Sequence, residues 1–149
     1  TNARGTFLGM TMDTTRADLP QAVLEGVAFA IRDSVEVARG LGIEISSSKL
    51  CGGGAKSPLW RQILANVLNV TLEIPVSEQG PGMGGAMLAM VAAGEYENVS
   101  QVCKKFVRTA QTVTPEPELV ARYERRYQQF RQIYPACKEL FANFAKEDM

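Results

Sequence analysis

Apolar side chains recur at helical spacing in three parts of the chain. In the first part, Asp18 and Gln21 have the spacing of a capping box, and Gly40 and Gly42 end the pattern. The apolar residues of this part recur every fourth position at Val23, Val27, Ile31 and Val35, with Leu24, Ala28 and Ala38 alongside. We therefore predict a helix that starts near Asp18 and ends at these glycines.

The second helical pattern follows Ser57, which can cap a helix, and Pro58, which can occupy a first helical turn. Its apolar positions have the spacing of one side of a helix and are Trp60, Ile63, Leu64, Val67 and Leu68. Trp60 is therefore predicted to lie in the first turn, beside the glycines that precede the helix.

The third pattern begins at a Thr-Pro-Glu-Pro start signal and covers the end of the chain. Its apolar positions alternate steps of three and four and are Val120, Tyr123, Tyr127, Phe130, Tyr134, Cys137 and Phe141. The pattern covers only about three heptads and contains Pro135, which should kink it, so a helix docked on the core is favoured over a coiled coil. Charged residues between these positions indicate a solvated face, and they are Arg122, Glu124, Arg125, Arg126, Lys138 and Glu139.

Shorter segments complete the pattern. Strands are predicted at residues 6–12, 49–51, 71–76 and 109–113, and helices at 80–96 and 100–106. A methionine stripe in the first of these helices, at Met83, Met87 and Met90, is typical of core filling. Alternating strands and helices predict an α/β or α+β domain. The strands are few and the chain starts abruptly, so we expect a fragment whose first strand pairs with strands outside it.

Composition narrows the function classes. The chain has 149 residues, of which 46% are hydrophobic, and this is enough for one compact domain. Sixteen basic and sixteen acidic residues give no net charge, so no electrostatic footprint for nucleic acid or an anionic membrane is present. No apolar run approaches the roughly 20 residues of a membrane span, and the polar start lacks the apolar core of a signal peptide. We expect a cytoplasmic protein.

Two residue types limit the chemistry. Cys51, Cys103 and Cys137 form no CxxC pair and are expected to be reduced, mostly buried thiols. The absence of histidine removes Ser/His and Cys/His nucleophilic pairs and most catalytic zinc sites. No catalytic residue and no metal ligand is therefore assigned within this chain.

Two glycine-rich stretches are candidates for nucleotide binding. In LCGGGAKSPLW, residues 50–60, Ala55 precedes Lys56 and Leu50 occupies the upstream position, so the P-loop pattern fails at both glycines. Residues 80–85 satisfy GxGxxG by letter, but Pro81 intrudes in the turn and no acidic ribose-binding residue follows at the expected distance. Both of these motif readings are rejected.

The remaining reading of residues 51–58 is a strand, a glycine turn and a helix whose N-terminus faces a nucleotide through backbone N–H groups. Gly53 and Gly54 lack Cβ atoms, so adenine or ribose could lie against the main chain, with Lys56 and Ser57 close enough to add polar contacts. A tight strand-to-helix turn without a ligand fits the same residues. Spacing alone leaves both interpretations open.

Four segments together resemble a known family. CGGGAKSPLWRQILANVLNVTLEIP, residues 51–75, is similar to the adenosine-binding segment of the FGGY family of carbohydrate kinases. ARGTFLGM, LEGVAFAIRDS and SEQGPGMGGAMLAMVAAGEY resemble the family in the same order. Within the family, the similarity is closest to the xylulose kinases.

This resemblance implies an actin-like ATPase fold of two ribonuclease-H-like domains, with residues 1–149 forming most of the C-terminal domain. The sugar-binding residues, the phosphate-binding motifs and the catalytic aspartate of the family lie upstream, so this chain alone is expected to be inactive. The nucleotide-binding positions carried over from the family are Gly53, Gly54, Ala55, Lys56, Ser57 and Pro58. The segment 80–86 resembles a buried helix-packing element.

The implied reaction of the complete enzyme is transfer of the ATP γ-phosphoryl group to the 5-hydroxyl of D-xylulose, with Mg²⁺ neutralising charge. A family kinase for glycerol, gluconate or ribulose is an alternative. A nonenzymatic adenine-nucleotide-binding domain, or one that forms a homodimer through its terminal helix, is another. One departure bears on affinity, because many relatives have Asp where this chain has Asn66.

Overall fold

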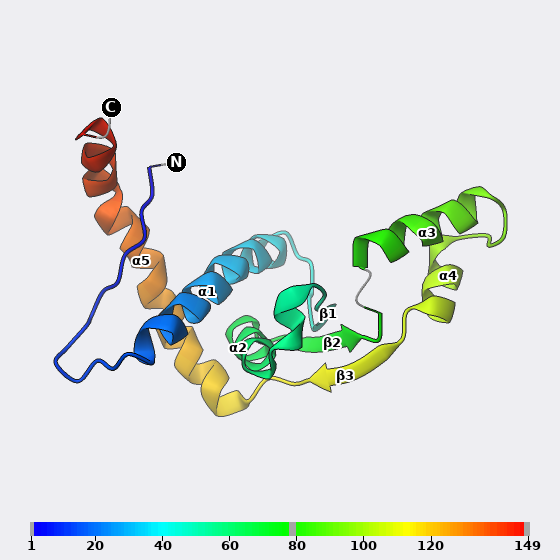
Figure 1. The fold of residues 1–149 in the computed structure, drawn as a ribbon, viewed down its shortest axis with the longest axis horizontal. Helices are drawn as coiled ribbons and strands as arrows, with labels where there is room; N and C mark the ends of the chain where they lie inside the picture. The colour runs from blue at the N-terminus through cyan, green and yellow to red at the C-terminus, as the bar shows by residue number, and fades with distance from the viewer. Residues whose placement is uncertain (1, 78–79, 148–149) are drawn as a thin grey trace.

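The structure is a computed structural model that describes residues 2–77 and 80–147 (Figure 1). The elements in chain order are α1 (Asp18–Gly40), β1 (Ser47–Lys49), the 3₁₀ turn η1 (Gly53–Lys56), α2 (Pro58–Leu68), β2 (Thr71–Pro75), α3 (Gly80–Ala92), α4 (Val99–Phe106), β3 (Thr109–Val113) and α5 (Pro117–Glu147). The described strands form one sheet of order β1-β2-β3, in which β1 and β2 are parallel and β2 and β3 antiparallel. The predicted mixed fold of helices and short strands is confirmed.

The sheet places the glycine turn at one of its edges. β1 and β2 are connected through η1 and α2, and Ser47 lies beside Thr71 in the parallel register. β2 alternates, with Leu72 and Ile74 buried and Glu73 on the opposite face, where its carboxylate accepts hydrogen bonds from Lys49 and Thr109. The glycines therefore follow the carboxyl end of β1, directly before α2.

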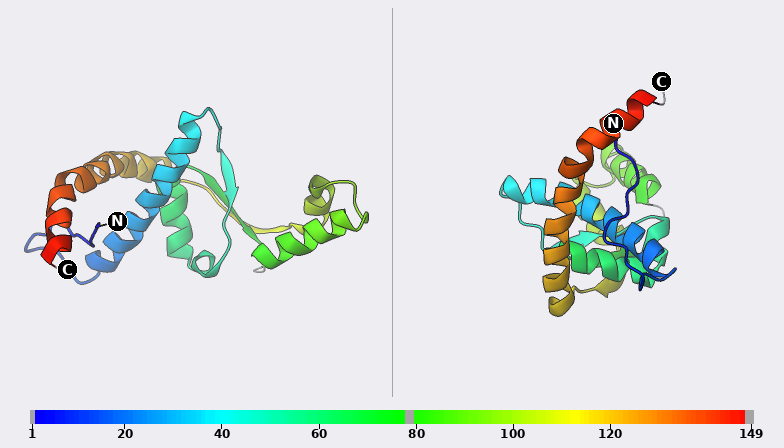
Figure 2. Two further views of the ribbon diagram at one scale, coloured as in Figure 1. Left: turned by 90° about the horizontal axis from the view of Figure 1, so that it is seen from above. Right: turned by 90° about the vertical axis from the view of Figure 1, so that its left-hand side faces the viewer.

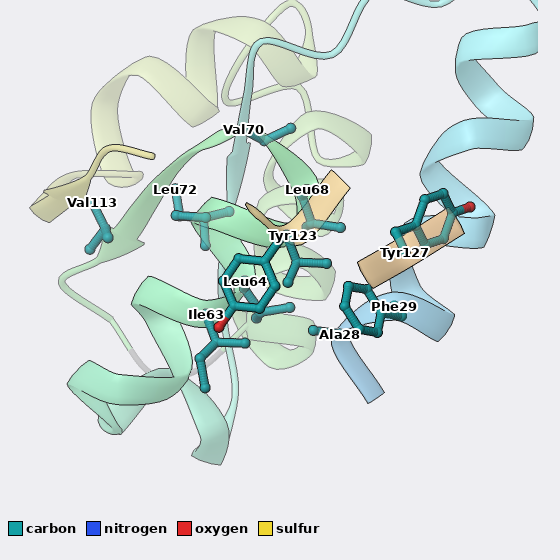
Figure 3. Packing of buried hydrophobic residues seen from close by; sticks show 12 residues of the cluster. Ala28, Phe29, Ile63, Leu64, Leu68, Val70, Leu72, Val113, Tyr123 and Tyr127 are labelled. Atoms are coloured by element: carbon teal, nitrogen blue, oxygen red, sulfur yellow. The ribbon is translucent and has the colours of Figure 1, made fainter. Parts of the chain in front are cut away.

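The core lies where α1, α2 and α5 meet the sheet (Figure 3). Its buried side chains come from all of these elements and include Ala28, Phe29, Ile63, Leu64, Val67, Leu68, Leu72, Val113, Tyr123 and Tyr127. Phe29 packs against three rings of α5, with centroid distances of 6.1 Å to Tyr123, 6.0 Å to Tyr127 and 5.3 Å to Phe130. The predicted apolar face of α2 and the docking of α5 are confirmed.

Polar contacts also join α5 to α1. Arg32 is buried, lies with its guanidinium 4.2 Å from the centre of the Tyr127 ring, and pairs with Glu124. Arg126 pairs with Glu25 at 2.8 Å. The prediction that Glu124 and Arg126 belong to a solvated face was therefore wrong, because both charges meet partners on the neighbouring helix.

The apolar residues predicted for α1 lie only in part on the core: Leu24, Ala28 and Val35 pack there, and the rest of the stripe does not. Val23 and Val27 are 52% and 50% exposed, and Ile31 is exposed as well, whereas Ala28, Phe29 and Arg32 are buried. α2 and α5 cover one side of α1, and no other described helix or strand covers its opposite side.

The capping box at the start of α1 was also wrong. The N-cap is Ala17, which makes no side-chain cap. The Asp18 carboxylate instead accepts a hydrogen bond of 2.7 Å from the backbone N–H of Thr15, upstream of the helix.

Residues 2–17 contain no helix or strand, so the strand predicted at residues 6–12 was wrong. The segment passes beside α1 and α5, and its side chains Phe7, Leu8, Met10 and Met12 are at least half exposed (Figures 1 and 2). No described strand lies beside this segment to share backbone hydrogen bonds with it.

The helices α3 and α4 form an arm that projects from the far end of the sheet (Figures 1 and 2). α3 packs on α4, and Met83, Met87 and Met90 are only half-buried; no side chain described in α3 is buried. The core-filling role of these methionines and the buried packing role of residues 80–86 were therefore wrong for this chain, because α4 alone covers α3.

α5 continues as a helix through Pro135 and curves along its length (Figure 2). Its second half leaves the core, and Tyr134 is 50% exposed. Cys103 and Cys137 are half-buried and Cys51 is exposed, so the expectation of mostly buried thiols was wrong for Cys51. None of the helices in the described ranges has the length and hydropathy needed to cross a membrane.

Candidate functional site

The glycine turn at residues 52–57 connects β1 to α2, and each of its glycines has a different environment. Gly52 has φ of +90°, a conformation that side-chain-bearing residues rarely adopt. A methyl group built on Gly54 would lie 3.0 Å from Cδ1 and Nε1 of Trp60, which is closer than atoms normally pack. Gly53 has neither constraint, because a methyl group there would meet no atom of the described chain within 4 Å.

Backbone hydrogen bonds close the turn and start the helix. The N–H of Ala55 donates to the carbonyl of Gly52 at 3.0 Å, and the N–H of Ser57 donates to the carbonyl of Gly54 at 3.1 Å. The Ser57 hydroxyl then accepts from the N–H of Trp60 at 3.3 Å, and Pro58 is the first residue of α2. The predicted cap and the predicted proline start are confirmed.

Ala55 is the only one of the six predicted site residues whose side chain is buried; Gly53, Gly54, Lys56, Ser57 and Pro58 are exposed. The structure thus brings all six onto one continuous surface turn at the N-terminus of an 11-residue helix. A helix N-terminus carries a partial positive charge and favours anionic or electron-rich groups. The turn itself carries two polar side chains, the amine of Lys56 and the hydroxyl of Ser57, and the thiol of Cys51 lies just before it.

Two neighbours shape the turn from outside the predicted set. Trp60 is half-buried and lies against Gly54, as its position in the first turn of α2 predicts. Gly80, at the start of α3, lies close to Cys51, since a methyl group on Gly80 would be 3.5 Å from the Cys51 Cβ.

Sequence reasoning missed Arg61. The Nε of Arg61 donates to the carbonyl oxygen of Ala55, and its Nη1 donates to Oε1 of Gln111 in β3 at 2.6 Å. A signal was present, because residue 61 lies one helical turn after Ser57 and so faces the end of the turn. Gln111 gave no such signal, since its proximity depends on the pairing of β2 with β3.

Asn66, the departure from the family pattern, lies away from the glycine turn. It is buried in the last part of α2, and its Oδ1 accepts hydrogen bonds from the backbone N–H of Glu116 at 2.8 Å and from Gln62 at 3.2 Å. Asn66 therefore holds the chain that leads into α5.

No group of three or more acidic or cysteine side chains that could hold a metal ion occurs in the part of the chain that the structure describes.

Comparison with known proteins shows which proteins this chain resembles in sequence and in fold. The xylulose kinase of Staphylococcus epidermidis is 34% identical over 140 residues, which are 94% of this chain and 28% of that protein. The ribulokinase of Halalkalibacterium halodurans is 38% identical over 136 residues, which are 87% of this chain and 24% of that protein. The crystal structure of a gluconate kinase from Lactobacillus acidophilus superposes with a TM-score of 0.88 at 26% identity, covering 96% of this chain and 29% of that one.

The chain spans less than a third of the length of each of these relatives. Its fold is the one found in sugar kinases, the actin-like ATPase fold. The sequence profile of the FGGY family of carbohydrate kinases, C-terminal domain, matches residues 1–93, and the chain therefore belongs to that family.

Proposed function

We propose that residues 1–149 form most of the C-terminal, nucleotide-binding part of an ATP-dependent kinase that phosphorylates D-xylulose at its 5-hydroxyl. The observation that carries this proposal is the exposed glycine turn, in which Gly53 faces open space at the N-terminus of α2. Membership of the carbohydrate kinase family supports a sugar as the acceptor, and the xylulose kinase relatives favour D-xylulose.

In this proposal the turn binds and does not catalyse. Gly53 and Gly54 offer the main chain to the adenosine end of the nucleotide, and Ala55, Lys56, Ser57 and Pro58 border it. Magnesium would supply charge neutralisation at the phosphates. The sugar, the phosphates and the reacting hydroxyl would be held by residues outside this chain, so the 149-residue chain should not transfer phosphate by itself. The site of action would be the cytoplasm.

Nucleotide binding is tested by titrating the purified chain with ADP, following Trp60 fluorescence and checking by calorimetry. Gly53→Arg places a long side chain in the open space before the turn and should weaken ADP binding roughly tenfold or more, since it blocks close approach to the backbone. Gly85→Arg is the matched control, because Gly85 is exposed and a methyl group there also meets nothing within 4 Å.

The control also separates the two glycine stretches, since Gly85 belongs to the GxGxxG stretch and Gly53 does not. Equal ADP affinity in Gly53→Arg and the unsubstituted chain would remove the turn from the site. If Gly85→Arg loses ADP affinity while its folding is unchanged, the nucleotide site would be assigned to α3 instead of the glycine turn.

The acceptor is tested on the complete kinase polypeptide that contains this chain. We expect kcat/KM with ATP to be highest for D-xylulose among D-xylulose, ribulose, gluconate and glycerol. Ribulose is the specific competitor, because the ribulokinase relative is 38% identical to this chain. A higher kcat/KM for ribulose would overturn the assignment of D-xylulose and leave the nucleotide site in place.

A further inference from the structure

Arg61 connects the glycine turn, α2 and the distant strand β3. It lies in the first turn of α2, its Nε donates to the Ala55 carbonyl of the glycine turn, and its Nη1 donates to Gln111 of β3 at 2.6 Å. Arg61 is half-buried and Gln111 is exposed. The planar guanidinium donates in two fixed directions, so its two acceptors define where the Ala55 carbonyl lies relative to the sheet.

Ala55 is thereby held at both ends. Its N–H is bonded to Gly52, its carbonyl is bonded to Arg61, and its side chain is buried. Gly53 and Gly54 lie in the chain between Gly52 and Ala55. A methyl group built on Gly53 would meet no atom of the described chain within 4 Å. A surface turn with open space around it is mobile unless hydrogen bonds fix it, and fixing it before the ligand arrives lowers the entropy cost of binding.

We propose that Arg61 is a positioning residue for nucleotide binding: it holds the Ala55 carbonyl so that the Gly53–Gly54 backbone is preformed, and Gln111 orients Arg61. Arg61 acts through the turn and makes no contact with the nucleotide. This inference rests on the proposed nucleotide site, but its first consequence, an ordered turn, exists without nucleotide.

The test uses two readouts on the 149-residue chain. The first is amide hydrogen exchange at Ala55 and Ser57, whose N–H groups are bonded within the turn. Arg61→Ala should speed this exchange about fivefold, since local opening becomes easier. The second is the dissociation constant for ADP, which should rise roughly tenfold in Arg61→Ala, the size expected when one charge-assisted hydrogen bond is lost.

Two further variants should show smaller losses of ADP affinity than Arg61→Ala. Arg61→Lys keeps the charge and one donor direction and should recover part of the ADP affinity. Gln111 is exposed, so the variant Gln111→Ala should fold normally. Its ADP affinity should be roughly twofold to threefold below that of the unsubstituted chain.

Gln62→Ala is the matched control for loss of structure. Gln62 is the next residue of α2, and it also ties the helix to the chain after β3, through the Thr114 carbonyl at 3.1 Å, without touching the glycine turn. It should leave both turn exchange and ADP affinity unchanged while costing comparable stability.

Unchanged exchange at Ala55 and Ser57 in Arg61→Ala would overturn the positioning role whatever the nucleotide does. Equal effects of Arg61→Ala and Gln62→Ala on ADP affinity would overturn it as well, because they would reflect general loosening of α2. Faster turn exchange in a chain that binds no ADP would support the role of Arg61 in ordering the turn and would reject the nucleotide site itself.

Discussion

Asn66 connects the end of α2 to the start of α5 by a single buried oxygen. Its Oδ1 accepts from the backbone N–H of Glu116, the residue immediately before α5. Asn66→Ala should therefore lower the free energy of unfolding by about 1–3 kcal/mol, because the N–H of Glu116 loses its acceptor and a buried side chain is truncated. Asn66→Asp keeps the acceptor and places a negative charge at a helix N-terminus, so it should retain most of the stability.

Urea denaturation of the chain measures this effect. Asn143→Ala is the matched control, because Asn143 is an exposed asparagine of α5 and its loss should change stability by less than about 0.5 kcal/mol. Equal denaturation midpoints for Asn66→Ala and Asn143→Ala would contradict the anchoring role. The same denaturation midpoint for Asn66→Asp and the unsubstituted chain would show that a carboxylate can replace the amide as acceptor.

The glycine turn illustrates what could be predicted at single residues. The sequence marked the turn, the cap at Ser57 and the neighbouring Trp60, because these depend on residues close in the chain. It could not show which glycine is needed for which reason. Gly52 has a backbone conformation that favours glycine, and Gly54 leaves no room for a side chain beside the indole of Trp60. Nothing in the described chain requires a glycine at Gly53. These differences arise from three-dimensional neighbours, as does the contact of Arg61 with Gln111.

The contact between α1 and α5 predicts an alkaline transition. Burial, reinforced by the hydrogen bond to Glu25, raises the pKa of Tyr123 to about 12, and burial with the hydrogen bond to Asp33 raises the pKa of Tyr127 to about 12. Unfolded tyrosine has a pKa near 10.0, so above that pH the unfolded chain loses protons that the folded chain retains. Stability should therefore be full below pH 10 and fall between pH 10 and 12, by on the order of 2 kcal/mol for each tyrosine.

Phenolate absorbance during a pH titration checks this prediction. Two tyrosines, Tyr123 and Tyr127, should ionise late in the folded chain, toward pH 12. Tyr127→Phe should remove a late one. Ionisation of Tyr123 and Tyr127 near pH 10, in a chain that is still folded, would contradict their contacts with Glu25 and Asp33.

Helices and strands could be predicted from the sequence where the residues of the element itself determine its secondary structure. The helices near residues 18–40, 58–68 and 117–147 and the strands at 71–75 and 109–113 follow from periodicity and from capping residues. Which side of α1 is buried depends on where α2 and α5 pack, and apolar residues on both sides of α1 gave no preference. The strand expected at 6–12 needs a neighbouring strand for its hydrogen bonds, and a local pattern cannot supply one.

Many large hydrophobic side chains are exposed in the described part of the chain, among them Phe7, Leu8, Val23 and Val27. An open groove of about 1460 Å³ lies between residues 3–9, α1 and α5, and Val23 and Val27 line it. We expect the chain to bind an apolar fluorescent dye with a rise in emission of about fivefold, while its near-ultraviolet circular dichroism still reports ordered aromatic packing.

Val27→Gln, which changes an exposed position of this groove, should reduce the dye emission without lowering stability. Leu88→Gln is the control, because Leu88 is 59% exposed on α3, outside the groove. Dye emission that is equally low for the unsubstituted chain and for Val27→Gln would contradict an accessible apolar groove.

The arm of α3 and α4 leaves the sheet and returns to the same place. The N–H of Val76 donates to the carbonyl of Arg108 at 2.9 Å, so the two ends of the arm are joined by one hydrogen bond that continues the pairing of β2 with β3. A connecting segment whose two ends lie next to each other can be lengthened, shortened or exchanged at small entropic cost. The strands on either side of it keep their register. The strands on either side of the arm thus meet at its base, and the register of the sheet does not depend on the length of the chain between them.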